Sequence, residues 1–141
     1  MKLKLIVDGR GPVPGELLGK AALVVLRGNQ TLLEKVRPGG LTSNQSEFIA
    51  IINGLSYLKE EVELGTPLKK ATLLSDSQLA VNCITGAFKT KNEELKKLAT
   101  EAKNLGAALS ELGVKVSLEW TPRVNTKQAD VLMRCLTEEA P

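Results

Sequence analysis

Residues 71–86 of the chain, ATLLSDSQLAVNCITG, join a short apolar run directly to a helical pattern. Ala71 to Leu74 has the length and apolar content of a buried strand. Ser75-Asp76-Ser77 follows at once and offers good N-cap side chains, and Gly86 supplies a stop signal for the helix. A buried strand that passes straight into a helix favours a sheet with helices packed on it.

Upstream of this unit, the sequence predicts an antiparallel meander and a helix. A loop rich in glycine and proline separates the first two strands, and Gly28-Asn29 marks a hairpin turn before the third. The predicted strands are Lys2–Val7, Lys20–Arg27 and Gln30–Arg37. From Asn44 to about Leu64, apolar side chains recur at helical spacing, which predicts an amphipathic helix.

Downstream, residues 92–112 are dense in Lys, Glu, Leu and Ala and form a second long helical stretch. Gly113 separates it from a strand over Val114–Trp120, and a last helix begins near Thr126. The order βββαβααβα predicts an α/β fold, with a five-stranded mixed sheet and helices on both faces.

The 141 residues, 43% of them hydrophobic, suit one domain over 1–141 with a continuous core. No apolar stretch approaches about eighteen residues, and the N-terminus leads into a strand-like run, so we expect a soluble, cytoplasmic protein. Cys83 and Cys135 lie in helical segments and suit buried small hydrophobes in a reducing compartment better than a disulfide or a metal site.

The charge balance restricts the chemistry without fixing it. The 19 Lys+Arg and 16 Asp+Glu give a net charge of +3, which permits phosphate binding but does not require it. The chain has no histidine, which excludes Ser-His-Asp and Cys-His catalysis and histidine metal ligation. Catalysis must therefore rely on carboxylates, lysine or a bound ion.

Four acidic residues stand at element ends. Asp8 ends the first strand and Asp76 the fourth, and carboxyl ends of parallel neighbours form ligand sites. Glu47 lies in the first turn of the helix after the hairpin, and Asp130 lies one turn into the final helix. These segments are neighbours in the predicted sheet, so the four side chains form a candidate site.

Each of the four also has a plain structural explanation. Asn44-Gln45-Ser46-Glu47 fits a capping box, Asp76 fits an N-cap, Asp8 suits the Gly-Pro turn, and Asp130 suits helix surface. Taken together they are harder to explain, because like charges near 4 Å repel by about 4 kcal/mol per pair at an effective dielectric of about 20. Oxygen ligands favour Mg²⁺ or Mn²⁺ as compensation, and two such ions about 4 Å apart catalyse phosphoryl transfer.

With these residues in place, the chain resembles a type 1 ribonuclease H along nearly its whole length. The matching stretches are Val7-Asp8-Gly9, Thr42-Ser43-Asn44-Gln45-Ser46-Glu47, Ser75-Asp76-Ser77-Gln78-Leu79, Lys89-Thr90-Lys91-Asn92 and Ala129-Asp130. The resemblance implies the ribonuclease H-like fold and hydrolysis of the RNA strand of RNA/DNA hybrids, with 5′-phosphate and 3′-hydroxyl products. It also implies activity without a protein partner or a membrane.

The resemblance further implies roles for particular residues. Asp8, Glu47, Asp76 and Asp130 would hold two Mg²⁺ ions, or Mn²⁺ in their place, against the scissile phosphate. Among substrate contacts, Asn44 and Gln45 would meet 2′-hydroxyls across the minor groove, and Thr42 would seat a DNA-strand phosphate. Lys89 and Lys91 are candidates for backbone contacts, although a solvated helix rim explains either lysine equally well.

The chain also departs from the family pattern. Arg10 stands where members often carry serine or alanine, in a shortened loop, so substrate approach near Asp8 differs. Many members have a mobile histidine in the loop before the last aspartate, and here Arg123 is the nearest polar candidate for its place. We hypothesise that Arg123 assists at the scissile phosphate or in product release. The usual asparagine is displaced to Asn125.

Two further features concern substrate binding. The stretch from Thr85 to Asn92 is brief, so the basic protrusion of some members is absent, and weak substrate affinity or reliance on a partner follows. Trp120 is predicted to be a core residue rather than a base-stacking one.

Two other functions are compatible with these residues. Integrases, transposases and junction resolvases place acidic residues on a similar sheet, so the substrate could be another nucleic acid. The chain could also be a catalytically weak or silent nucleic-acid-binding module, because Arg10 and the changed final loop could disturb the site.

Overall fold

The computed structural model describes residues 1–139, with side chains placed through Cys135. Its elements follow the predicted order βββαβααβα, with one short 3₁₀ helix, η1, added before the last helix. Their bounds are β1 Lys2–Arg10, β2 Lys20–Arg27, β3 Gln30–Pro38, α1 Ser43–Glu63, β4 Lys70–Ser75, α2 Gln78–Thr85, α3 Glu93–Glu111, β5 Lys115–Trp120, η1 Arg123–Thr126 and α4 Lys127–Glu139.

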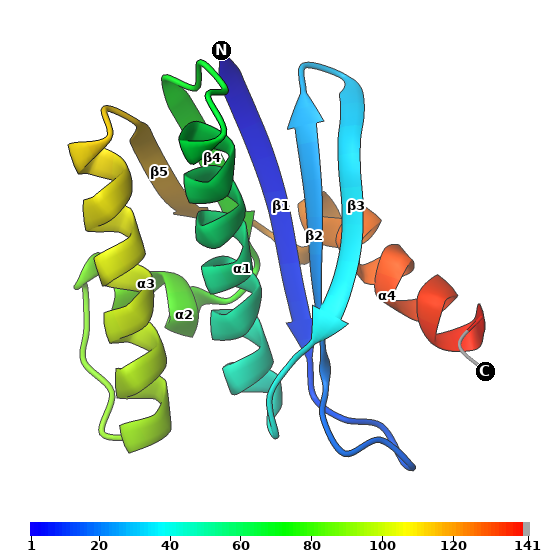
Figure 1. Ribbon diagram of the computed structural model, residues 1–141. Coiled ribbons are helices and arrows are strands. Elements are labelled where there is room, and N and C mark those ends of the chain that lie inside the picture. Colours follow the sequence, from blue (N-terminus) through cyan, green and yellow to red (C-terminus); the bar gives the residue numbers. More distant parts are fainter. Residues whose placement is uncertain (140–141) are drawn as a thin grey trace.

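The five strands form one mixed sheet in the order β3-β2-β1-β4-β5, which confirms the predicted α/β fold (Figure 1). β1 pairs with β2, and β2 with β3, in antiparallel register. β4 runs parallel to β1, and β5 runs parallel to β4. The carboxyl ends of these three parallel strands therefore lie at the same edge of the sheet.

Helices cover both faces of the sheet, as predicted (Figure 1). On the first face, α1, α2 and α3 enclose the main core, which includes Leu5, Val7, Phe48 and Leu73. On the second face, α4 packs on β1, β2 and β3 around a smaller core. That core contains Ile6, Ala22, Val24, Ala129 and Met133. Strict alternation along β1 thus divides its side chains between two hydrophobic layers.

Two helix starts differ from the predicted caps. Thr42 is the N-cap of α1, where its Oγ1 accepts the backbone N–H of Gln45 at 3.1 Å. The N-cap of this helix therefore lies two residues before the predicted Asn44. Ser77, and not Asp76, caps α2, and its Oγ accepts the N–H of Ala80 at 3.1 Å. Neither Glu47 nor Asp76 is used as a cap, so both carboxylates are available for another role.

Two side chains that we expected in the core lie outside it. Cys83 is buried, but Cys135 is exposed on α4, so the prediction of two buried cysteines was wrong for Cys135. Trp120 is 45% exposed, because it ends β5, which is an edge strand. Its Nε1 donates a hydrogen bond to the backbone oxygen of Asp76 at 3.2 Å. Trp120 therefore lies beside the predicted site.

Within residues 1–139, no helix is long and apolar enough to cross a membrane.

Candidate active site

Three of the four predicted carboxylates meet at the carboxyl edge of the sheet. Asp8, Glu47 and Asp76 each offer one oxygen, and these oxygens lie within 4.8 Å of one another. Asp8 and Glu47 are buried, and Asp76 has a partly exposed backbone but a buried side chain. Side chains from β1, α1 and the β4–α2 junction thus form a compact acidic cluster, as expected from the order of the strands.

Gly9 allows α1 to approach β1 closely enough to form this cluster. A Cβ at residue 9 would lie 2.3 Å from the backbone carbon of Ser46 and 2.5 Å from the nitrogen of Glu47. No side chain fits in that space. The N–H of Gly9 donates to Oδ1 of Asp8 at 2.9 Å and to Oε1 of Glu47 at 3.1 Å. Our sequence analysis missed this role, although the Asp-Gly pair was its visible signal.

Asp76 is held by residues of the last part of the chain. Its Oδ2 accepts hydrogen bonds from Nε of Arg123 and from Oγ1 of Thr126, both at 3.2 Å. The Arg123 side chain is 80% exposed, whereas that of Asp76 is 7% exposed. The arginine we singled out therefore lies against the cluster with most of its guanidinium open to solvent. The role of Thr126, which is fully buried, was not predicted.

Burial and mutual repulsion make the cluster unfavourable when all its members are ionised. Burial, reinforced by the charge of Asp76, raises the pKa of Asp8 to about 6. Burial and the charges of Asp8 and Asp76 raise the pKa of Glu47 to about 9. Oε2 of Glu47 is buried and has no hydrogen-bond partner among the described residues. A cation that binds these oxygens would remove both the repulsion and the unsatisfied acceptor.

Asp130 lies beside the cluster rather than within it. It is half-buried in the first turn of α4, and its Oδ2 forms an ion pair with Arg134 at 3.3 Å, one helical turn further on. Its negative charge contributes to the raised pKa of Asp8. Asp130 is therefore near enough to influence the ionisation of Asp8. In this structure, however, its carboxylate is paired with Arg134.

Apart from Arg123, the residues predicted to bind substrate lie in two parts of the chain. Thr42, Asn44 and Gln45 open α1, and Oε1 of Gln45 accepts the N–H of Leu41 at 2.8 Å. Lys89 and Lys91 are exposed on the connection 86–92 between α2 and α3. The structure describes no helix within this connection.

Arg10 is engaged within its own loop. Its two terminal nitrogens bind the two carboxylate oxygens of Glu16 at 2.8 and 3.2 Å. The guanidinium of Arg10 holds the pKa of Glu16 down at about 2. The carboxylate of Glu16 therefore offsets much of the positive charge of Arg10. From the sequence, the position of Arg10 directly after Asp8-Gly9 had suggested that it could disturb the site.

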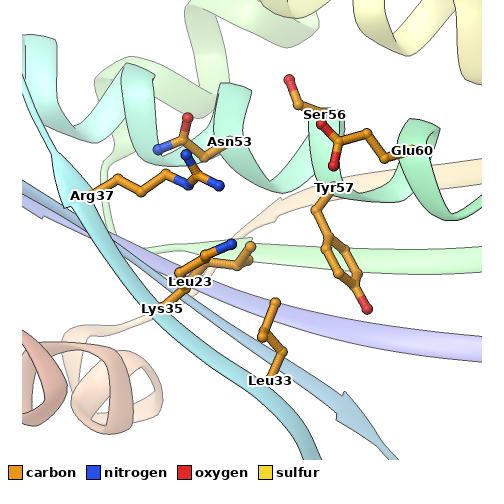
Figure 2. A pocket seen from close by; sticks show the side chains of 8 residues that line it. All are labelled: Leu23, Leu33, Lys35, Arg37, Asn53, Ser56, Tyr57 and Glu60. Carbon is orange, nitrogen blue, oxygen red and sulfur yellow. The ribbon is translucent and has the colours of Figure 1, made fainter.

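A separate hollow of about 260 Å³ lies between β3 and α1 (Figure 2). It is lined by Leu23, Leu33, Lys35, Arg37, Asn53, Ser56, Tyr57 and Glu60. None of the predicted site residues is among them. This hollow is therefore distinct from the carboxylate cluster.

Comparison with known proteins identifies relatives with this architecture. The family model described as RNase H matches residues 6–131. Bifunctional protein Rv2228c of Mycobacterium tuberculosis is 32% identical over 136 residues, which are 94% of this chain and 34% of that protein. The uncharacterized protein Mb2253c of Mycobacterium bovis matches to the same extent. The chain therefore spans about a third of the length of these curated relatives.

Solved structures show the same fold. RNase H1 from Halobacterium salinarum has a TM-score of 0.79 at 24% identity, covering 99% of this chain and all of that one. The N-terminal RNase H domain of Rv2228c from M. tuberculosis has a TM-score of 0.74 at 27% identity, covering 99% of both chains. LC11-RNase H1, in complex with an RNA/DNA hybrid, has a TM-score of 0.76 at 23% identity and 94% coverage of both chains.

Proposed function

The chain belongs to the RNase H family, and from that premise we propose that it is an endoribonuclease that hydrolyses the RNA strand of RNA/DNA hybrids. The products would carry 5′-phosphate and 3′-hydroxyl ends. One observation carries the proposal: three carboxylates meet within 4.8 Å, and one of their buried oxygens has no partner among the described residues. We further propose that residues 1–141 form a single RNase H domain and that the protein is cytoplasmic, as expected from the sequence.

The donor set fits a hard divalent cation. Asp8, Glu47 and Asp76 supply only oxygens, which suit Mg²⁺ or Mn²⁺. Asp130 would complete the set after its ion pair with Arg134 opens. Two bound ions would supply positive charge at the scissile phosphate and would lower the pKa of a water for attack.

The chain's own groups orient that site. The N–H of Gly9 holds one oxygen of Asp8 and one of Glu47, so the second oxygen of each carboxylate remains available as a ligand. The hydroxyl of Thr126 donates a hydrogen bond to Oδ2 of Asp76 and holds that carboxylate. Rigidly held ligands need little rearrangement when charge develops on the substrate. We propose that these three contacts pre-organise the cluster for catalysis.

Arg123 is the residue best placed to bind the substrate phosphate. Only its Nε contacts Asp76, and the side chain is otherwise largely exposed beside the cluster. A guanidinium carries five N–H donors in a planar fork that matches phosphate geometry. We propose that Arg123 binds the scissile phosphate or the released 5′-phosphate, while the residues at the start of α1 and on the 86–92 connection bind the flanking strands.

A weakly active or silent binding module is the second candidate, because two arginines engage the predicted ligands. Asp76 is paired with Arg123, and Asp130 with Arg134. If these pairs persisted in the presence of metal, the site would lack two of its four ligands. Action on another nucleic acid is the remaining alternative, since the fold alone does not fix the substrate.

The test is cleavage of a labelled RNA/DNA hybrid beside RNA duplex, DNA duplex and single-stranded RNA, with Mg²⁺ or Mn²⁺. Asp8→Asn and Glu47→Gln keep the size of the side chains but remove charge, whereas Glu101→Gln removes an exposed carboxylate on α3 as a control. Hybrid-selective cutting that disappears in the first two variants alone supports the proposal. Intact hybrid with every metal and a sound fold would favour the binding module.

A further inference from the structure

A row of lysines crosses the sheet at the end opposite the carboxylates. The register pairs Lys2 of β1 with Lys70 of β4, and Lys70 with Lys115 of β5. Neighbouring strands lie about 4.8 Å apart, so the three residues form a line roughly 10 Å long. All three lysines are exposed. Three adjacent strands therefore present like charges side by side.

These lysines lie on the second face of the sheet. Leu3 and Leu5 point into the main core on the first face, so Lys2 and Lys4 point the other way. The helices that pack extensively on β4 and β5 are α1, α2 and α3, all on the first face, whereas α4 packs on β1, β2 and β3. Figure 1 shows α4 beside β2 and β3, away from β5. We call Lys2, Lys4, Lys70 and Lys115 the lysine face.

The lysine face lacks acidic partners of its own. Among the described residues, none of its four lysines forms an ion pair within 4.0 Å. Glu119 shares this side of β5, but it lies four residues beyond Lys115 and accepts a hydrogen bond from Ser117. Like charges directly opposite each other destabilise a sheet. An external polyanion would compensate this row of charges.

The helix α3 shows the contrasting arrangement. Its exposed Lys96 and Lys97 pair with Glu93 and Glu94 one turn away. Such alternation is typical of a solvated surface. The lysine face differs from it in having cations fixed on rigid strands without interleaved acids.

We propose that the lysine face binds the phosphate backbone of the nucleic acid whose scissile phosphate lies at the carboxylate cluster. The identity of this polyanion rests on the proposed function. Asp8 points to the same side of β1 as Lys2 and Lys4, and six residues of strand separate Lys2 from it by roughly 20 Å. At the roughly 3.4 Å rise per nucleotide of a DNA duplex, this separation corresponds to about six nucleotides along a duplex that lies parallel to β1. This surface would do the work that a basic protrusion does in some members of the family.

The test measures binding rather than cleavage. Fluorescence anisotropy in EDTA compares the full chain with its Lys70→Gln/Lys115→Gln variant on two hybrids. One has about 20 base pairs, and the other is a hairpin of about 5, too short to reach the lysine face. We expect the variant to bind the long hybrid at least about fivefold more weakly than the wild type. The slope of log K against log salt concentration should fall by an amount that corresponds to about two phosphate contacts. Affinity for the short hybrid should be unchanged.

The matched control is Lys96→Gln/Lys97→Gln, which removes two exposed lysines from α3. The inference is overturned if the lysine-face variant binds the long hybrid like the wild type. It is also overturned if the lysine-face variant loses affinity equally for the long and the short hybrid, or if the control variant loses as much affinity as the lysine-face variant. Only the net charge of the protein would then matter. Cleavage with Mg²⁺, measured in parallel, tests the proposed function separately. If the hybrid stayed intact but binding depended on hybrid length as expected, the proposed cleavage would be contradicted and the lysine-face proposal would stand.

Discussion

The carboxylates of Asp8 and Glu47 accept the same backbone N–H, that of Gly9, at 2.9 and 3.1 Å. Two buried acids are thereby held together by a single donor, while burial and mutual repulsion raise the pKa of both. The arrangement favours protonation or a bound cation over two free charges. Several properties of the protein should depend on this relationship.

Replacing Gly9 with alanine should disrupt the cluster. The new Cβ would meet the backbone of Ser46 at 2.3 Å, so α1 must move away from β1. Overpacking of this kind typically costs about 1–3 kcal/mol, and Glu47 would move away from Asp8. We expect lower thermal stability together with loss of hybrid cleavage and of metal binding by calorimetry.

Gly106→Ala is the matched control for that substitution. No atom lies within 4 Å of the position of its Cβ in α3, so alanine should stabilise the helix by roughly 0.5–1 kcal/mol. If Gly9→Ala behaved like Gly106→Ala, the close approach of α1 to β1 would not matter for the site.

The stability of the metal-free protein should fall as pH rises. A carboxyl group whose pKa is higher in the folded than in the unfolded protein stabilises the folded state. This stabilisation is fully present at pH values below the unfolded pKa and is lost as the pH rises through the folded pKa. For Asp8 and Glu47 those folded values are about 6 and about 9. Thermal melts in EDTA should therefore show a decreasing melting temperature from pH 5 to 9. Glu47→Gln should flatten the upper part of that slope, whereas a wild-type melting temperature that rises over this range would contradict the raised values.

Magnesium should stabilise the protein most at high pH. Ionised Asp8 and Glu47 bind the cation, and binding to the folded state alone stabilises by about 2.7 kcal/mol at 100 times the dissociation constant. Melting temperatures with and without Mg²⁺ at pH 6 and pH 8.5 measure this coupling. Asp8→Asn should abolish the shift, and a shift that survives in this variant would place the metal elsewhere.

Arg123→Ala should lower turnover more than it lowers stability. Its side chain is largely exposed, so little packing is lost, but the phosphate loses a neighbouring guanidinium. We expect kcat to fall by at least about tenfold if the contact forms only in the transition state. Arg27→Ala is the control, because it removes an exposed arginine at the end of β2 that lies away from Asp8. Unchanged turnover in Arg123→Ala would remove this residue from the mechanism.

Trp120 should report directly on the site. It is the chain's one tryptophan, it is 45% exposed, and its Nε1 binds the backbone oxygen of Asp76. Metal binding at Asp76 should change its fluorescence, and Asp76→Asn should remove that change. Identical emission spectra with and without Mg²⁺, under conditions where hybrid is cut, would contradict the proposed involvement of Asp76.

The sequence alone determined the order of the elements and the positions of the acidic residues. Strand and helix periods depend on neighbours within a few residues, and stops such as Gly86, with φ at 90°, act locally. The resemblance to ribonuclease H then rested on motifs that are contiguous in the chain. The periodicity of the elements and the contiguous motifs can both be recognised in the sequence without knowledge of the packing.

Only the tertiary structure decided which side chains meet. Glu47 and Gly9 are 38 residues apart, and Thr126 and Asp76 are 50 apart, so their hydrogen bonds depend on how α1, β1 and η1 pack. The same packing leaves Asp130 paired with Arg134 and Trp120 on an exposed sheet edge. Local patterns cannot encode such contacts, because the positions of these groups follow from the close packing of the whole core.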